Sequence, residues 1–160
     1  MTELSWGELS AQCPDLADAG RAILYQFSVG LAFLSTVRRD GGPRVHPVCP
    51  LLAESGMYAF IIPSPKRDDL RRDPRYALHS YPTEDNEDGF YLTGSASEIF
   101  DPALRARLSQ RFLSERPGID LSDESLANQS LFEFRIASCL LTRTNGHGDP
   151  NPRHEIWHAK

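Results

Sequence analysis

At 160 residues, with 40% hydrophobic and 24% charged side chains, the chain has the length of one domain, predicted over residues 1–160. Its 17 basic and 22 acidic residues give a net charge of −5, which disfavours nucleic acid or an anionic membrane as a partner. Three widely spaced cysteines without a CxxC pair indicate neither a disulfide framework nor a zinc site, and the lack of a long apolar run or a basic leader predicts a cytoplasmic protein.

The first part of the chain predicts one helix followed by strands. Residues 10–26 carry apolar side chains at spacings of three and four, the pattern of one amphipathic helix. A β-like run over 31–37 leads into the turn formers of 40–43, and the next strand is expected over 44–52. Pro47 removes a hydrogen-bond donor from that strand, so the strand is predicted at a sheet edge or where the sheet opens.

A short helix is predicted after a further apolar strand, 57–62. Ser64 and Pro65 match an N-cap followed by proline at the first helical position, and Pro74 ends the helix. Lys66 and Arg67 then lie in the first turn, beside free backbone N–H groups, an arrangement that favours a phosphate. The alternative is a solvated helix face on which these cations pair with nearby aspartates.

The strand that starts at Arg44 is expected to bring further positive charge to this helix. Arg44, His46 and Val48 share one face of their strand. Antiparallel pairing with residues 57–62 would place Arg44 near the start of the helix, so that two elements converge on one anion. A surface arginine leaving a turn and a satisfied barrel histidine are the alternatives for Arg44 and His46.

The second half of the chain predicts more strands with helices between them. The expected strands cover residues 76–81, 90–100 and 131–142. Gly94 interrupts the second of these, where a bulge is the usual reason. A polar acidic loop over 82–89, a helix beginning at Asp101 and one weak helical turn near 124–129 complete the pattern. Five or six strands joined by tight turns predict a mainly β fold, an antiparallel β-barrel with peripheral helices.

The C-terminal segment matches the HExxH pattern of zinc proteases through His154, Glu155 and His158. That chemistry needs both histidines on one helix, a third ligand and a buried cleft. Prolines and asparagines precede the motif and only two residues follow it, so no metal site is predicted. Trp157 is expected to pack against a ring or a neighbouring subunit, or to close the edge of the core.

Four segments, in this order, resemble the pyridoxamine 5'-phosphate oxidase-like family of FMN-binding split β-barrels. They are LSTVRRDGGPRVHPV at 34–48, MYAF at 57–60, SPKRDDLRRDPRYAL at 64–78 and LTGSA at 92–96. The resemblance covers about residues 28–145 and implies an antiparallel split barrel of Greek-key type. It also implies FMN as the cofactor and a homodimer with two FMN sites at the subunit interface.

The resemblance further implies which residues bind the cofactor. The matching positions are Arg44, Val45, His46, Ile62, Pro63, Ser64, Lys66 and Arg67, joined by Trp157 of the partner subunit. Within this set, the cationic residues Arg44, Lys66 and Arg67 are predicted to contact the phosphate.

A flavin-dependent oxidoreductase acting on an unknown small molecule is the predicted function. No serine, cysteine or lysine has the base partner that nucleophilic catalysis requires, as expected if a flavin brings its own hydride chemistry. The segment 153–155 does not reproduce the phosphate-gripping signature of the vitamin B6 oxidases, so oxidation of pyridoxamine phosphate is not expected. The alternatives are a deazaflavin cofactor, haem bound by His46, His79 or His147, and a non-catalytic stress or binding protein.

Overall fold

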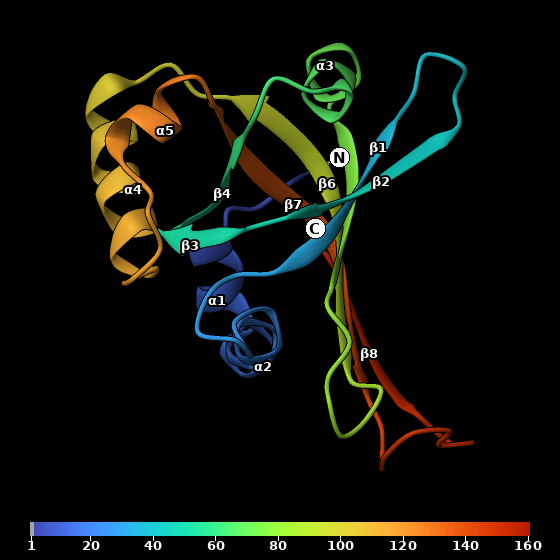
Figure 1. Ribbon diagram of the computed structural model, residues 1–160. Coiled ribbons are helices and arrows are strands. Elements are labelled where there is room, and N and C mark those ends of the chain that lie inside the picture. Colours follow the sequence, from blue (N-terminus) through green and yellow to red (C-terminus); the bar gives the residue numbers. More distant parts are fainter. Residues whose placement is uncertain (1) are drawn as a thin grey trace.

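The computed structural model describes residues 2–160 as one curved antiparallel sheet with helices against it (Figure 1). The strands are β1 (Ala32–Val37), β2 (Pro43–Val48), β3 (Leu51–Ala53), β4 (Gly56–Ile61), β5 (Arg75–Ser80), β6 (Gly89–Glu98), β7 (Ser130–Arg143) and β8 (Arg153–His158). The helices are α1 (Trp6–Gln12), α2 (Pro14–Leu24), α3 (Pro65–Arg72), α4 (Pro102–Ser114) and α5 (Asp123–Ala127). The strand order is β2-β1-β5-β6-β7-β4-β3, and β8 pairs with β7. This half barrel is the split-barrel architecture expected from the sequence.

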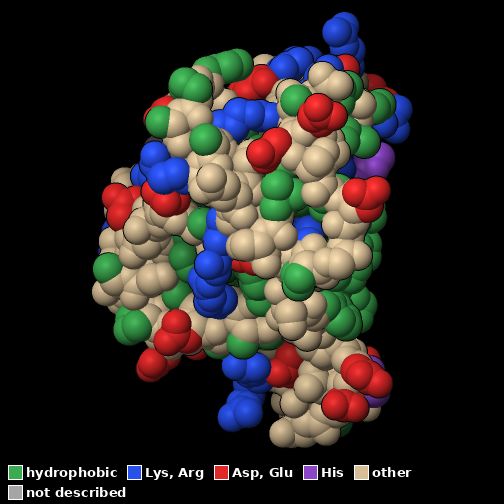
Figure 2. Space-filling view, turned by 60° about the vertical axis from the view of Figure 1, so that its left-hand side comes forward, with side chains coloured by type: hydrophobic (Ala, Val, Ile, Leu, Met, Phe, Trp, Pro, Cys, Tyr) green, Lys and Arg blue, Asp and Glu red, His purple; other side chains and the backbone are tan. Residues whose placement is uncertain are grey.

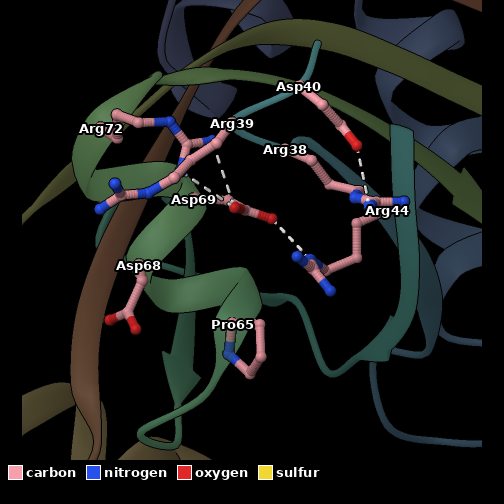
Figure 3. A pocket seen from close by; sticks show the side chains of 8 residues that line it. All are labelled: Arg38, Arg39, Asp40, Arg44, Pro65, Asp68, Asp69 and Arg72. Atoms are coloured by element: carbon pink, nitrogen blue, oxygen red, sulfur yellow. Dashed lines mark hydrogen bonds and ion pairs between the residues drawn. The ribbon is translucent and has the colours of Figure 1, made fainter. Parts of the chain in front are cut away.

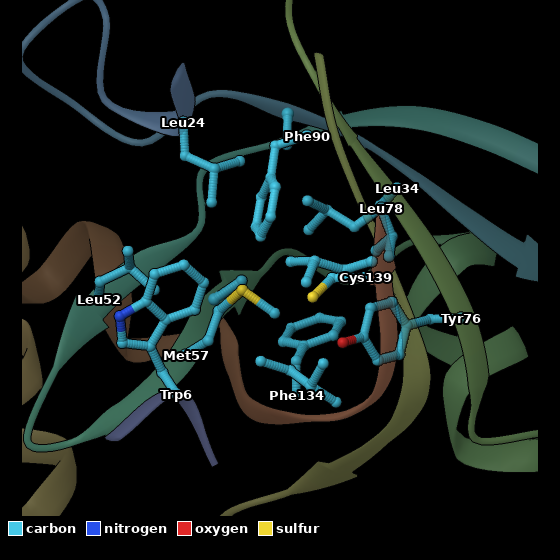
Figure 4. Packing of buried hydrophobic residues seen from close by; sticks show 14 of the residues in the cluster. Trp6, Leu24, Leu34, Leu52, Met57, Tyr76, Leu78, Phe90, Phe134 and Cys139 are labelled. Atoms are coloured by element: carbon cyan, nitrogen blue, oxygen red, sulfur yellow. The ribbon is translucent and has the colours of Figure 1, made fainter. Parts of the chain in front are cut away.

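The inner face of the sheet forms the main core. Period-two alternation in β1 and β5 directs Leu34 and Leu78 inward, where they lie opposite each other in the register and pack with Phe90 and Cys139 (Figure 4). The helix α2 approaches β6 so closely that a Cβ at Gly20 would lie 2.5 Å from the Phe90 ring. The absence of a side chain at Gly20 therefore allows α2 to pack closely against the sheet.

The N-terminal helical segment differs from the prediction of one helix over 10–26. Two helices form, because Pro14 cannot continue α1 and instead takes the first position of α2. The first helix starts earlier, at a capping box in which Ser5 and Glu8 each bond the backbone of the other.

The pairing expected for the strand after the first hairpin turn is wrong. The region 44–52 divides into β2 and β3, which lie at the two edges of the sheet. The strand β2 pairs with β1 across the turn, and β4 lies between β7 and β3. The position of Pro47 on an edge strand is confirmed. Arg44 still reaches the short helix, because β1 and β2 lie next to α3 (Figure 1).

Most of the remaining elements follow the prediction, but the sheet has eight strands instead of the five or six expected, and β8 was not predicted. The β6–β7 register shifts between Thr93 and Gly94, so the expected bulge is present. The Asp101 side chain accepts hydrogen bonds from the first-turn amides of α4. The segment with the HExxH pattern is the strand β8, which forms an arm with the ends of β6 and β7 (Figure 1). Among the described helices, none has the length and apolar content to cross a membrane.

Candidate functional site

Several of the predicted cofactor-binding residues lie at the start of the helix α3. Ser64 stands at the N-cap position, but its hydroxyl donates to the carbonyl of Ile62 at 2.8 Å and does not cap the helix. Pro65 is the first helical residue, as predicted. Ile62 and Pro63 lie exposed on the connection from β4, so their surfaces are available to a ligand.

Lys66 lies at a cavity of about 240 Å³. Its Nζ donates to the carbonyl oxygen of Pro47 at 3.0 Å, which links α3 to the edge strand β2. Burial lowers the pKa of the Lys66 ammonium from its ordinary value. Most of the cavity wall is apolar, with Val48, Ile62 and Tyr81 among its residues. A planar ring with an attached anion matches this combination of an apolar wall and one cation.

Arg44 reaches α3 through a buried carboxylate. Its Nε lies 2.7 Å from Oδ2 of Asp69, a residue only 3% exposed. Thr36 donates its hydroxyl to the same oxygen at 3.0 Å, and Arg72 binds the other oxygen at 3.2 Å. Burial alone would raise the pKa of Asp69, but the hydrogen bonds from Arg44, Thr36 and Arg72 outweigh it and lower that pKa. Asp69 therefore holds Arg44 in place and offsets part of its charge.

The positive charges of Lys66 and Arg44 both act on His46. Burial lowers its pKa first, and the charges of Lys66 and Arg44 lower it further, so the neutral ring is favoured. Its Nε2 is buried and has no hydrogen-bond partner among residues 2–160. The neighbouring Val45 points the other way and is 60% exposed.

The structure does not bring every predicted residue to this place. Arg67 lies on the side of α3 that faces Glu98, where its charge lowers the pKa of that carboxylate after the larger effect of Arg71. Trp157 pairs with Cys139 in the register and packs against the main core, and it does not line the Lys66 cavity. Within one chain, the residues brought together are thus Arg44, His46 and Lys66.

Several residues of the Lys66 cavity were not predicted from the sequence. They are Leu31, Cys49, Phe60, Tyr81, Phe112 and Gln129. Tyr81 stacks on Phe33 with ring centroids 4.5 Å apart and an angle of 18° between the planes. The outward position of Phe33 in the β1 alternation was the available signal for this pair. Phe112 comes from α4, and no local pattern connects that helix to α3.

The surface carries both positive and negative side chains (Figure 2), as expected from the 17 basic and 22 acidic residues of the chain. On the face shown in Figure 2, Lys and Arg side chains are interspersed with Asp and Glu and with hydrophobic side chains. No group of three or more His, Cys, Asp and Glu residues able to hold a metal ion occurs in the part of the chain that the structure describes. His154 and His158 lie on a strand, where four residues span about 13 Å, unlike the single helical turn of a zinc protease.

The chain has a split β-barrel fold, which solved structures of pyridoxamine 5'-phosphate oxidase-like proteins share. No protein-family model matches the sequence, and no curated protein matches it either. A protein of the pyridoxinephosphate oxidase family from Clostridium acetobutylicum, related to general stress protein 26 of B. subtilis, has a similar structure. Its sequence is 13% identical to this chain, the two structures superpose with a TM-score of 0.58, and the match covers 95% of each chain.

Two haem-associated proteins have the same fold. The haem storage protein HutZ from Vibrio cholerae shares 17% identity with a TM-score of 0.59, over 78% of this chain and 89% of its own. A haem-binding protein from Mycobacterium smegmatis shares 18% identity with a TM-score of 0.61 over 88% of this chain. The match spans 57% of the length of that protein. At these identities the similarities establish the fold.

Proposed function

We propose that this protein binds FMN beside the first turn of α3 and acts as a flavin-dependent oxidoreductase of the pyridoxamine-phosphate-oxidase-like family. The observation that carries the proposal is the position of Lys66. Lys66 lines an apolar cavity, and its ammonium lies within hydrogen-bonding distance of an edge strand. Arg44 and His46 come from that same strand, β2, so two elements supply the polar groups around one place.

The side chains of this site have complementary tasks in the proposal. Lys66 binds the phosphate through charge-assisted hydrogen bonds, and Arg44, whose guanidinium lines a neighbouring cavity, adds positive charge from the other side of the first turn of α3. Pro47, Ile62 and Tyr81 contact the ring and exclude water from one of its faces. A bound flavin supplies hydride transfer from its own ring, so the protein has to position it and admit a small substrate.

A homodimer is part of the proposal, because one chain supplies too small a cavity. The volume of about 240 Å³ lies below the roughly 300–1,000 Å³ of typical ligand sites. One face of the sheet is also left without helices: Phe33, Tyr91 and Ile156 lie on an outward row that the strand register carries from β1 to β8. A second copy on this face would complete the cavity and supply the partner subunit's Trp157.

Haem is the second candidate, supported by His46. A neutral imidazole with a buried Nε2 that lacks a partner is a suitable axial ligand. Two proteins of the same fold are described as haem-binding or haem-storing. In this case Lys66, at the neighbouring cavity, would bind a propionate.

The absorption spectrum of the purified protein, followed by titration with FMN, tests the proposal. A yellow flavin spectrum and quenching of FMN fluorescence on binding are expected, whereas a Soret band lost on His46→Ala would support haem instead. Lys66→Met keeps the aliphatic stem and removes about 1.5–3 kcal/mol of phosphate binding, a tenfold to hundredfold rise in Kd. Arg107→Met, on an exposed side of α4, is the control and leaves Kd unchanged. FMN affinity that is the same in Lys66→Met would contradict the proposal.

A further inference from the structure

A second cavity, of about 380 Å³, lies between α3 and the turn that joins β1 to β2 (Figure 3). Four arginines line it: Arg38, Arg39, Arg44 and Arg72. Pro65 lines this cavity whereas the next residue, Lys66, lines the first one, so the N-terminal turn of α3 separates the two.

The carboxylates of this arginine cavity leave part of its positive charge uncompensated. Asp69 is shared by Arg44 and Arg72, and Asp40 pairs with Arg38 at 2.9 Å. The third carboxylate, Asp68, is paired at 3.5 Å with Arg67, which does not line the cavity. Counted together with Arg67, five guanidinium groups stand against three carboxylates, which leaves two positive charges in excess.

Two arginines of the cavity are held in place by a carboxylate, and the cavity also has guanidinium groups that are free to bind an anion. Figure 3 shows Asp69 between Arg44 and Arg72, so one buried carboxylate orients two guanidinium groups. Arg44 uses only its Nε for this contact. Its terminal amino groups, and the whole Arg39 guanidinium, have no hydrogen-bond partner in the described chain from residue 2 onward. Arginine forks of this kind bind phosphate oxygens in pairs and lose little freedom on binding.

We infer that this arginine cavity is an anion site for a diphosphate group. Two excess charges and several oriented guanidinium donors match an anion with more than one phosphate, and the volume suits a small ligand. The diphosphate can belong to a separate small molecule. It can also belong to a dinucleotide whose ring lies in the Lys66 cavity, across the first turn of α3. The site itself stands on the contacts of the arginines and does not depend on FMN binding.

Isothermal titration calorimetry with sodium pyrophosphate at low ionic strength tests the inference. Saturable binding with one site per chain is expected, with a Kd at least tenfold higher in Arg38→Gln/Arg39→Gln. Both arginines are exposed at the turn between β1 and β2, so the double variant is expected to retain the fold. A thermal melt checks that it does. The matched control is Arg107→Gln/Arg111→Gln, which removes the same charge at a different two-arginine cavity on α4 and leaves Kd within twofold. Absence of saturable binding, or an equal loss in the control pair, would overturn the inference.

Two further titrations identify the source of the diphosphate. If a separate molecule carries it, FMN and pyrophosphate bind together, and Arg38→Gln/Arg39→Gln leaves FMN affinity unchanged. If the cofactor carries it, FAD binds more tightly than FMN, pyrophosphate competes with FAD, and the double variant removes the advantage of FAD. Lys66→Met retains pyrophosphate binding in both cases, so failure of the FMN site is distinguishable from failure of the arginine cavity.

Discussion

At the scale of single residues, Asp69 is the group on which the arrangement around α3 depends. Its almost fully buried carboxylate accepts hydrogen bonds from Thr36, Arg44 and Arg72. Removing a buried partner leaves the opposite charges uncompensated, although Arg44 and Arg72 are about one-third exposed and water offsets part of the cost. Asp69 thus connects the sheet, the helix and the arginine cavity through one side chain.

The change Asp69→Asn is expected to lower the free energy of unfolding at pH 7 by about 2–3 kcal/mol, measured by urea denaturation. The folded-state pKa of Asp69 lies below its ordinary value of 3.8, so its contribution is present above that pH and is lost as pH falls through the folded pKa. The difference between the two proteins should therefore shrink when the pH is lowered below 3.8. A difference that stays constant down to pH 2 would contradict this assignment.

At the scale of the elements, the bulge in β6 brings two backbones close together. A Cβ added at Gly94 would lie 1.9 Å from the carbonyl oxygen of Arg135 on β7. Gly94→Ala must shift one strand, and we expect a loss of about 1–3 kcal/mol, measured by urea denaturation. Gly42→Ala is the control, because the nearest atom to its added Cβ is the Asp40 side chain at 3.2 Å. Equal stability of Gly94→Ala and the wild type would show that the bulge relaxes freely.

The elements also show what the sequence could and could not predict. Local signals were sufficient for the bulge at Gly94 and for the start of α3 at Ser64 and Pro65, because each depends on neighbouring residues. Strand partners were not predictable in the same way: β4 pairs with β7, about seventy residues further on, and no periodicity within β4 specifies that partner. The site divides similarly. Lys66 was predicted as a candidate from the turn in which it lies, whereas Phe112 reaches the cavity from a helix distant in sequence.

At the scale of the whole molecule, one face of the sheet has no helix packed against it in the described residues 2–160. The helices α1, α2, α4 and α5 lie together on one side of the barrel strands, and the β8 arm extends away from them (Figure 1). Phe33 is 36% and Ile156 66% exposed on the outward face. An apolar sheet face of this kind is typical of an interface, and its edges β2 and β8 have hydrogen-bonding groups available for a second chain.

Ile156→Lys is expected to convert the proposed homodimer into a monomer, because it places a charge within the outward apolar row. Analytical ultracentrifugation measures the change as a shift in sedimentation coefficient. Ile119→Lys is the matched control: that isoleucine is 60% exposed but lies in the loop between α4 and α5, so the dimer should persist. If the cavity is completed by a second copy, Ile156→Lys also weakens FMN binding while Ile119→Lys does not. A wild-type protein that sediments as a monomer would contradict both expectations, since the cavity would then belong to one chain alone.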